Sequence, residues 1–428
     1  MARLPGRAVG FWLVANLAMV AIGLQDAWEL FGFGTVGSLF VDLNYVLSAI
    51  ECTRMGIDVV VANPCDVLGR RFIYPPAWLD LAVFPLAGAD TRWLGVLLGA
   101  AFLALVAWVL RPRGPVAWTV GLLLILSPTT VYLVERGNVD AILFLLTTAV
   151  LATSARGLEA WRLVAMCGAV VATLLKVYPV VLFLVIAPSL QLERRKFFGY
   201  LIATTAVGLA YLVFHWQEVL RFISGVPSQN SLAMFGASVL PWSIELITRG
   251  TLPTVLSHPV ALAGLFFVFA AGLALIVESK KTLRIDEVSR GARFFAGGGL
   301  VLVFCFLTGT HVAYRLVYVI LMIPFLFEMV LAGRSAVARW LGGYLLFWCI
   351  LTCWNLLFVV TLVNHLTSLD TVRAVEAFVP WLDAYIMFYQ GATWVALAAV
   401  AVQATHVIHR VQVPIGRPCQ MVSESATT

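Results

Sequence analysis

The chain has 428 residues, of which 61% are hydrophobic and only 12% charged, and its formal net charge is +6. A mean hydropathy of +0.96 and repeated apolar runs near the ~20 residues that cross a bilayer exclude a soluble globular protein and predict a polytopic helical membrane protein. The runs lack the alternation of polar and apolar residues seen in a transmembrane barrel. Membrane topology accounts for the positive charge, so we expect no nucleic-acid partner.

The first apolar run follows Arg3 and Arg7 like a signal peptide, but no convincing cleavage site comes after it, so we interpret it as a retained signal anchor. Together the runs predict an all-α bundle of about twelve transmembrane helices in a single domain, residues 1–410, followed by a disordered cytoplasmic tail at 411–428. The expected helices are 8–25, 92–110, 115–133, 139–154, 161–175, 177–190, 197–214, 259–277, 294–309, 316–332, 340–363 and 384–405.

The basic residues indicate the orientation, because most of them fall in alternate loops and at both termini. The positive-inside rule then places both termini in the cytoplasm of a multi-pass protein of the cell (inner or plasma) membrane. A first outer loop, 26–91, and a central outer loop, 215–258, lie on the other side. Within them, residues 76–88 and 239–250 are apolar but too short to span comfortably, so we expect helices that lie at the interface.

Asp42 follows the first membrane helix and is the main catalytic candidate. A carboxylate kept at a bilayer boundary usually has a function, and a positioned carboxylate can remove a proton from a hydroxyl nucleophile. The alternative is an ordinary solvated loop residue. Tyr74, which stands before Pro75 and Pro76 at the end of the same loop, is a candidate for contacting a sugar or an acceptor.

Three polar residues meet at the next outer turn. Arg136, Asn138 and Asp140 lie between two apolar runs, where they could bind sugar hydroxyls and a phosphate or form an ionic helix boundary. Lys176 interrupts an apolar stretch directly before Tyr178 and Pro179. It could bind a donor phosphate, or its ammonium group could reach the lipid headgroups without binding anything.

His311 and Arg315 lie in a short turn between two later helices. An imidazole beside a guanidinium suits phosphate, because arginine presents a planar fork of donors; a capping role for His311 is the alternative. Histidines and cysteines elsewhere do not have metal-ligand spacing. We therefore expect neither a metal ion nor a cofactor.

Cys52 and Cys65 are the only two of the seven cysteines that fall in an outer loop. The outer compartment is oxidising, so a disulfide between them is expected, while two free thiols remain the alternative. The other five cysteines lie in membrane helices or in the tail, where thiols stay reduced.

The order of these elements resembles the GT-C superfamily of membrane glycosyltransferases. The elements are Asp42, a Tyr-Pro-Pro sequence, an Arg-Gly-Asn-x-Asp turn, a Lys-x-Tyr-Pro break, an Asn-Ser-Leu sequence beginning at Asn230, and the turn with His311 and Arg315. Over residues 40–330 the order is similar to glycosyltransferase family 87, the polyprenyl-phosphate-mannose-dependent α-mannosyltransferases of actinobacterial envelopes.

This resemblance implies inverting transfer of a hexose, most often mannose, from a polyprenyl-phosphate donor to a hydroxyl of a lipid-linked or glycan acceptor on the outer face. Asp42 would be the base, and Asn230 would contact the acceptor although the adjacent Gln229 is displaced from the family pattern. The Asp-x-Asp of metal-dependent members is absent. A lipid-sugar flippase and a non-catalytic envelope assembly protein remain alternatives, and membrane lipids are expected partners in each case.

Overall fold

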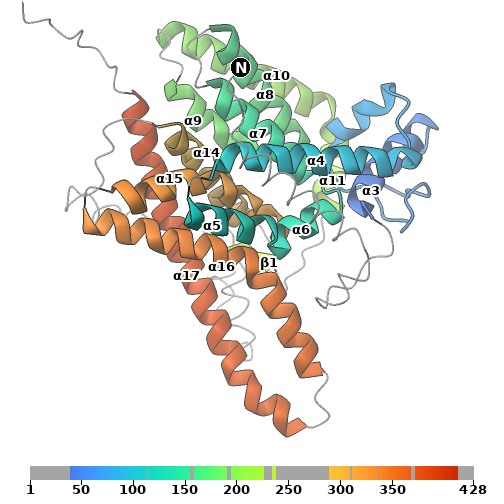
Figure 1. Cartoon of the computed structure of the whole chain (residues 1–428). Helices are drawn as coiled ribbons and strands as arrows, with labels where there is room; N and C mark the ends of the chain where they lie inside the picture. Colours follow the sequence, from blue (N-terminus) through green and yellow to red (C-terminus); the bar gives the residue numbers. More distant parts are fainter. Residues whose placement is uncertain are drawn as a thin grey trace, which may run out of the picture.

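The computed structural model describes residues 39–112, 114–154, 159–189, 194–225, 234–237, 289–308, 311–333, 335–367 and 372–412. Nearly all of this chain is helical (Figure 1). The helices and strands are α3 (Val41–Arg54), η1 (Pro76–Val83), η2 (Gly88–Asp90), α4 (Thr91–Leu110), α5 (Pro115–Ile125), α6 (Pro128–Glu135), α7 (Asp140–Ser154), α8 (Glu159–Leu175), η3 (Tyr178–Val181), α9 (Leu182–Ser189), α10 (Arg194–Phe214), α11 (Trp216–Gly225), β1 (Met234–Phe235), α14 (Arg290–Thr308), β2 (His311–Val312), η5 (Ala313–Tyr318), α15 (Val319–Ala332), α16 (Ala336–Thr367) and α17 (Val372–Gln412).

Five helices of the described chain are long and apolar enough to cross a membrane, or six if one bent pair is counted as a span. The five are Gly88–Leu110, Arg290–Thr308, Tyr314–Ala332, Ala336–Asn355 and Phe388–Ile408. The protein is therefore a helical chain with the character of a membrane protein, but twelve spans are not confirmed. The expected helices at 8–25 and 259–277, the interfacial helix at 239–250 and the tail beyond α17 lie outside the described residues.

The expected helix at 115–133 is not one straight helix. It consists of α5 and α6, which meet at an angle of 46°. Pro128 has no backbone N–H to donate into the preceding turn, and Ser127 caps the new helix by accepting a hydrogen bond from the Thr130 N–H. A proline preceded by a capping serine therefore ends one helix and starts the next.

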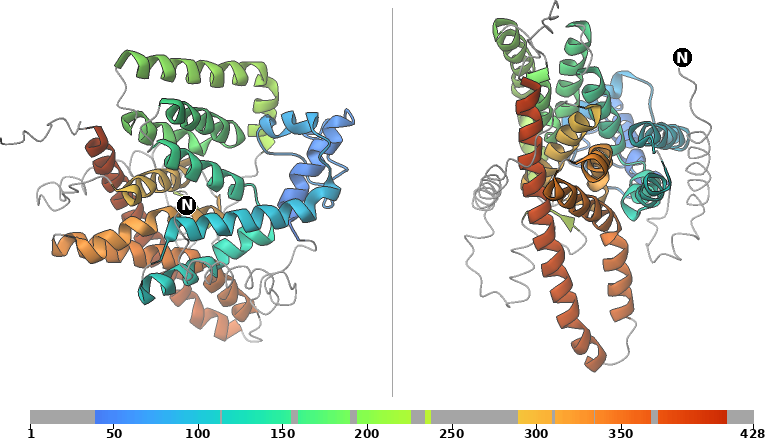
Figure 2. Two further views of the ribbon diagram at one scale, coloured as in Figure 1. Left: turned by 45° about the horizontal axis from the view of Figure 1, so that its top comes forward. Right: turned by 60° about the vertical axis from the view of Figure 1, so that its left-hand side comes forward.

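The helix α14 lies at the centre of the bundle, with α15 and α17 packed against it (Figures 1 and 2). Gly298 makes the approach of α15 possible, because an added Cβ there would stand 2.7 Å from the Leu321 Cβ and 2.9 Å from the Tyr318 carbonyl oxygen. The main core contains large side chains from several helices, among them Phe102, Phe144, Phe295, Phe306 and Trp348.

The described part of the predicted first outer loop, residues 39–91, is itself folded. The helix α3 lies at its start, and a second apolar cluster, including Tyr45, Ile50, Phe72 and Trp78, holds α3 against the following segment. The region 76–88, where a short helix was expected, contains the 3-10 helix η1 and the start of the 3-10 helix η2. The helix α3 was not among the expected helices, because its burial depends on long-range contacts that periodicity does not reveal.

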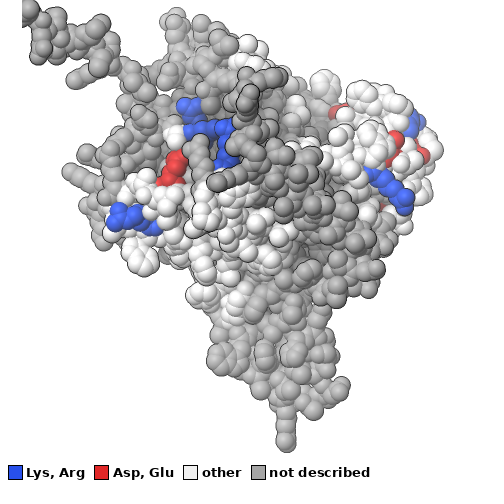
Figure 3. Space-filling model, in the orientation of Figure 1, with Lys and Arg blue, Asp and Glu red and all other residues white. Residues whose placement is uncertain are grey.

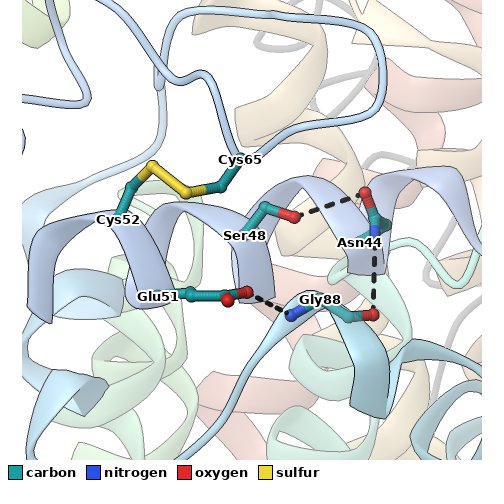
Figure 4. Close-up of a disulfide and its surroundings, with 6 residues drawn as sticks. All are labelled: Asn44, Ser48, Glu51, Cys52, Cys65 and Gly88. Carbon is teal, nitrogen blue, oxygen red and sulfur yellow. Dashed lines mark hydrogen bonds between the residues drawn. A yellow bond between two sulfur atoms is a disulfide. The ribbon is translucent and has the colours of Figure 1, made fainter. Parts of the chain in front are cut away.

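Hydrogen bonds tie α3 to the start of the first described span (Figure 4). Glu51 accepts a hydrogen bond of 2.9 Å from the Gly88 N–H, and the Asn44 amide donates to the Gly88 carbonyl over 3.4 Å. On the other side of α3, Cys52 and Cys65 form a disulfide whose Cα atoms are 6.0 Å apart. This is the pairing expected from the sequence.

The all-helical expectation has one small exception. Met234 pairs with Val312 and Phe235 with His311 in a two-residue antiparallel ladder. The ladder places residues 234–235, within the predicted central outer loop, beside the two residues that precede η5.

Removing the disulfide should loosen the first outer loop. Because a bridge that closes a loop of this length stabilises by about 3 kcal/mol in the chain-entropy model, the double variant Cys52→Ser, Cys65→Ser should be cleaved in this loop about 100-fold faster by a protease. Cys167→Ser, at an exposed free cysteine, is the matched control. Mass spectrometry of non-reduced peptides checks the bridge directly, and two alkylatable thiols in native membranes would contradict it.

Candidate functional site

Asp42 lies in the first turn of α3, and its carboxylate is buried. Phe40 precedes the helix in the left-handed conformation with φ of 62°, which turns the chain sharply into α3. The backbone N–H groups of Phe40 and Asp42 donate to the carbonyl groups of Glu135 and Arg136 over 2.8 and 2.9 Å. Helix N-termini favour negative charge, so the position of Asp42 in α3 already stabilises its carboxylate.

Three side chains donate four hydrogen bonds to this carboxylate. Arg136 makes two of them, from Nη2 to Oδ1 over 2.6 Å and from Nε to Oδ2 over 2.7 Å. The Asn138 amide donates to Oδ2 over 2.7 Å, and Arg70 Nη1 donates to Oδ1 over 3.3 Å. A carboxylate has about four lone-pair positions, so Asp42 is fully hydrogen-bonded.

Arg70 is held in place independently of Asp42. Its guanidinium donates to both carboxylate oxygens of Asp66 over 2.9 and 3.0 Å and to the Val41 carbonyl over 2.8 Å. Its Cζ also lies 4.5 Å above the centre of the Tyr45 ring. Sequence analysis did not select Arg70, Asp66 or Tyr45, because nothing in their spacing shows that the segment after Cys65 folds back over the start of α3.

A second buried carboxylate, Asp140, begins α7. Its Oδ1 accepts a hydrogen bond from Lys176 Nζ over 2.9 Å and another from the Tyr178 hydroxyl. Arg315 Nε lies 3.5 Å from Oδ2. Lys176 and Asp140 have side-chain exposures of only 6% and 0%, so the lysine is an internal ion-pair partner, and its ammonium group does not reach outward to headgroups.

Asn138 links the two carboxylates. Its amide donates to Asp42, while its Oδ1 accepts the backbone N–H of Asp140 over 2.9 Å. Gly137 makes this turn possible with φ of 57°, and an added Cβ there would stand 3.1 Å from the Cβ atoms of Phe40 and Leu43. The turn between α6 and α7 therefore requires glycine both for its backbone conformation and for its close approach to α3.

Most of the candidate residues are brought together. Asp42, Arg136 and Asn138 form one contact group, and Asp140, Lys176 and Arg315 form another. Tyr74 lies at the second group, with its ring centre 5.1 Å from Lys176 Nζ. His311 belongs to β2, but its side chain and the whole of Asn230 lie outside the described residues. Within the described chain, no group of three or more His, Cys, Asp or Glu residues could hold a metal ion.

The electrostatic environment of Asp42 keeps it ionised. Burial by itself raises the pKa of the carboxyl group, but the hydrogen bonds and charge of Arg136, the amide of Asn138 and the charge of Arg70 together lower it below the usual 3.8. For Tyr74, burial is the largest influence, and it raises the pKa of the hydroxyl group well above 10. Near neutral pH the site therefore contains an ionised Asp42 and a neutral Tyr74.

Comparisons of the chain with protein-family models and with curated proteins found no match.

The stability of the protein should depend on the ionisation of Asp42. Because the folded-state pKa is lowered, the stabilisation is complete above the unfolded-state pKa and is lost as pH falls below about 4. Asp42→Asn leaves Arg136 without a charged partner. At neutral pH the variant protein should therefore unfold at a lower temperature, and its free energy of unfolding should fall by about 3 kcal/mol. The difference from the unmodified protein should shrink as pH falls from about 5 to 3.

Thermal unfolding in detergent at several pH values measures this difference. Asp58→Asn is the matched control, because its ion pair with Arg221 is exposed, with side-chain exposures of 51% and 58%, and exposed pairs contribute little. A deficit of Asp42→Asn that stays constant with pH would contradict the assignment.

Proposed function

We propose that this protein is a membrane glycosyltransferase. It transfers a hexose, with mannose the first to be tested, from a polyprenyl-phosphate donor to a hydroxyl group of a lipid-linked or glycan acceptor. In the proposed topology both termini are cytoplasmic, and the site around Asp42 opens to the outer face of the cell membrane. The motif order described above and the geometry of the buried charges support this proposal.

The observation that carries the proposal is the gathering of buried charge at one place. Within the described part of the chain, the buried charged side chains are Asp42, Asp66, Glu135, Asp140 and Lys176. All five belong to the two contact groups or to residues directly adjoining them. Burying paired charges rarely increases stability relative to apolar packing, so a cluster of this size in a membrane protein is better explained by chemistry at that position.

The proposed base is Asp42. In the present arrangement its four acceptor positions are filled, so an acceptor hydroxyl must replace one of the donors. The hydrogen bond from Arg70 is the natural one to give up, because its length of 3.3 Å is the longest and the Arg70 side chain is 29% exposed. Loss of that hydrogen bond would also raise the proton affinity of the carboxylate. The hydroxyl oxygen could then attack the anomeric carbon as its proton passes to Asp42.

The proposed leaving-group site is the group around Asp140. A polyprenyl phosphate carries away the electron pair of the broken glycosidic bond and leaves as an anion, which needs cations placed in advance. Lys176 and Arg315 approach Asp140 from two sides, so the carboxylate holds two cations together in a site of low polarity. A single displacement that uses one carboxylate base inverts the anomeric centre.

The flippase and assembly alternatives are less well supported. Movement of a charged headgroup across the bilayer requires a polar route through the whole membrane, whereas the other buried polar side chains in the described chain are uncharged, such as Thr352, Gln390 and Gln403. A purely structural protein would have no need for two buried carboxylates beside several cations.

Replacing the proposed base should stop transfer. Asp42→Asn removes the proton acceptor while nearly keeping the size of the side chain, so transfer from radiolabelled polyprenyl-phosphate mannose to a membrane extract should fall at least about 100-fold. Asp58→Asn should retain activity, and both variants should elute as folded, monodisperse protein. Activity of Asp42→Asn close to that of the unmodified protein would remove this residue from the role of base. Translocation of the donor without transfer would favour a flippase.

Removing either cation should impair use of the donor more than use of the acceptor. Lys176→Ala and Arg315→Ala each take away one positive charge from the proposed phosphate site, so the KM for the donor should rise about tenfold or more. The KM for the acceptor should change less. Arg92→Ala, at an exposed arginine at the start of α4, is the control. Equal effects on both substrates would contradict a donor-phosphate site.

A further inference from the structure

A second group of charges lies at the opposite end of α4 from Asp42. Near the start of α4, Gly95 packs beneath Phe40, which precedes Asp42. At the other end, Arg111 follows the last residue of α4, and Arg290 and Arg293 occupy the first turn of α14. With about 1.5 Å of rise per residue, the 20 residues of α4 separate the two ends by nearly a bilayer thickness. Basic side chains are visible at this end of the molecule, near α14 and α15 (Figure 3).

Two of these arginines share one aromatic ring. The Cζ of Arg290 lies 3.5 Å from the centre of the Trp108 ring, and the Cζ of Arg111 lies 5.3 Å from the same centre. The two like charges repel each other. Trp108 stabilises both cations through its π-face but does not neutralise either of them.

The group has unsatisfied donors. Arg290 Nη2 and Arg293 Nε are buried and have no hydrogen-bond partner among the described residues. Within the same residues, no carboxylate lies within 4.0 Å of any of the three guanidinium groups. The nearby Glu328 accepts a hydrogen bond of 2.7 Å from Ser289. Unpaired buried donors destabilise a fold unless a ligand satisfies them.

An apolar groove starts from the same end of the bundle. The helix α16 follows α15 after a short connection, and Arg339 in its first turn donates to the Gly333 carbonyl over 2.9 Å. The groove has a volume of about 510 Å³ and is lined along one face of α16 by Ala336, Arg339, Trp340, Gly343, Tyr344 and Phe347. The groove and the three arginines lie toward the same end of the bundle but on different helices.

We propose that Arg111, Arg290 and Arg293 bind the phosphate of an anionic glycerophospholipid at this end of the bundle. Guanidinium groups match phosphate oxygens in geometry and charge, and basic pockets between membrane helices are suited to anionic headgroups. A free phosphate ion shares the headgroup chemistry, but the three arginines stand at the ends of two candidate membrane spans, where lipid headgroups are found. This site is separate from the one around Asp42 and does not depend on the proposed transfer reaction.

Thermal unfolding of the delipidated full-length protein in detergent tests the site, with phosphatidylglycerol, phosphatidylcholine or inorganic phosphate added. Phosphatidylglycerol should raise the unfolding temperature by at least about 3 °C, and native mass spectrometry should detect it bound. The variant Arg290→Gln, Arg293→Gln should bind it about tenfold more weakly or worse. Arg92→Gln is the matched control, because this exposed arginine lies at the other end of α4 and should not change the effect.

Arg111→Gln provides a second variant at an exposed position and should weaken binding even if the double variant fails to fold. Selective stabilisation by phosphatidylglycerol that is lost in these variants supports the proposal. Equal stabilisation by phosphatidylcholine would overturn it, as would full retention of binding in the variants. An equal effect of inorganic phosphate alone would overturn the lipid assignment and identify a free anion as the ligand.

Discussion

The arrangement of the site depends on the ion pair between Asp42 and Arg136. It joins the first turn of α3 to the turn after α6, positions 94 residues apart in the chain, and it does so with two short parallel hydrogen bonds. Because both groups are largely removed from water, neither can lose its partner cheaply. The pair therefore fixes how the folded outer loop sits on the helical bundle, and the chemistry proposed for Asp42 has to operate within that constraint.

The same pair restricts how the site can work. A carboxylate with four donors is well ordered but weakly basic, so the proposed transfer would require a change in its contacts when an acceptor binds. Arg70 connects that change to the folded outer loop, since it also binds Asp66, the residue after the disulfide-bonded Cys65. The loop thus both completes the environment of Asp42 and supplies the contact that is easiest to release.

The two ends of the bundle differ in whether their charged side chains have oppositely charged partners. Around Asp42 and Asp140 each carboxylate has cationic partners, which keeps the buried site nearly neutral overall. Around Trp108 the arginines have no acidic partner within the described part of the chain. The first arrangement is compatible with the proposed transfer site, and the second with the proposed binding of an anionic headgroup.

Hydropathy and residue order alone determined that the chain is helical, that it has the character of a membrane protein, and that Asp42, Arg136, Asn138, Asp140 and Lys176 are its notable polar residues. These are local properties, because apolar length and an isolated charge in an apolar run can be read without knowing the fold. Only the tertiary structure decided that Lys176 pairs with Asp140, that Arg70 reaches Asp42, and that α3 is buried. Each of these contacts joins segments that are distant in the chain, and their energies arise from burial and geometry that no local pattern specifies.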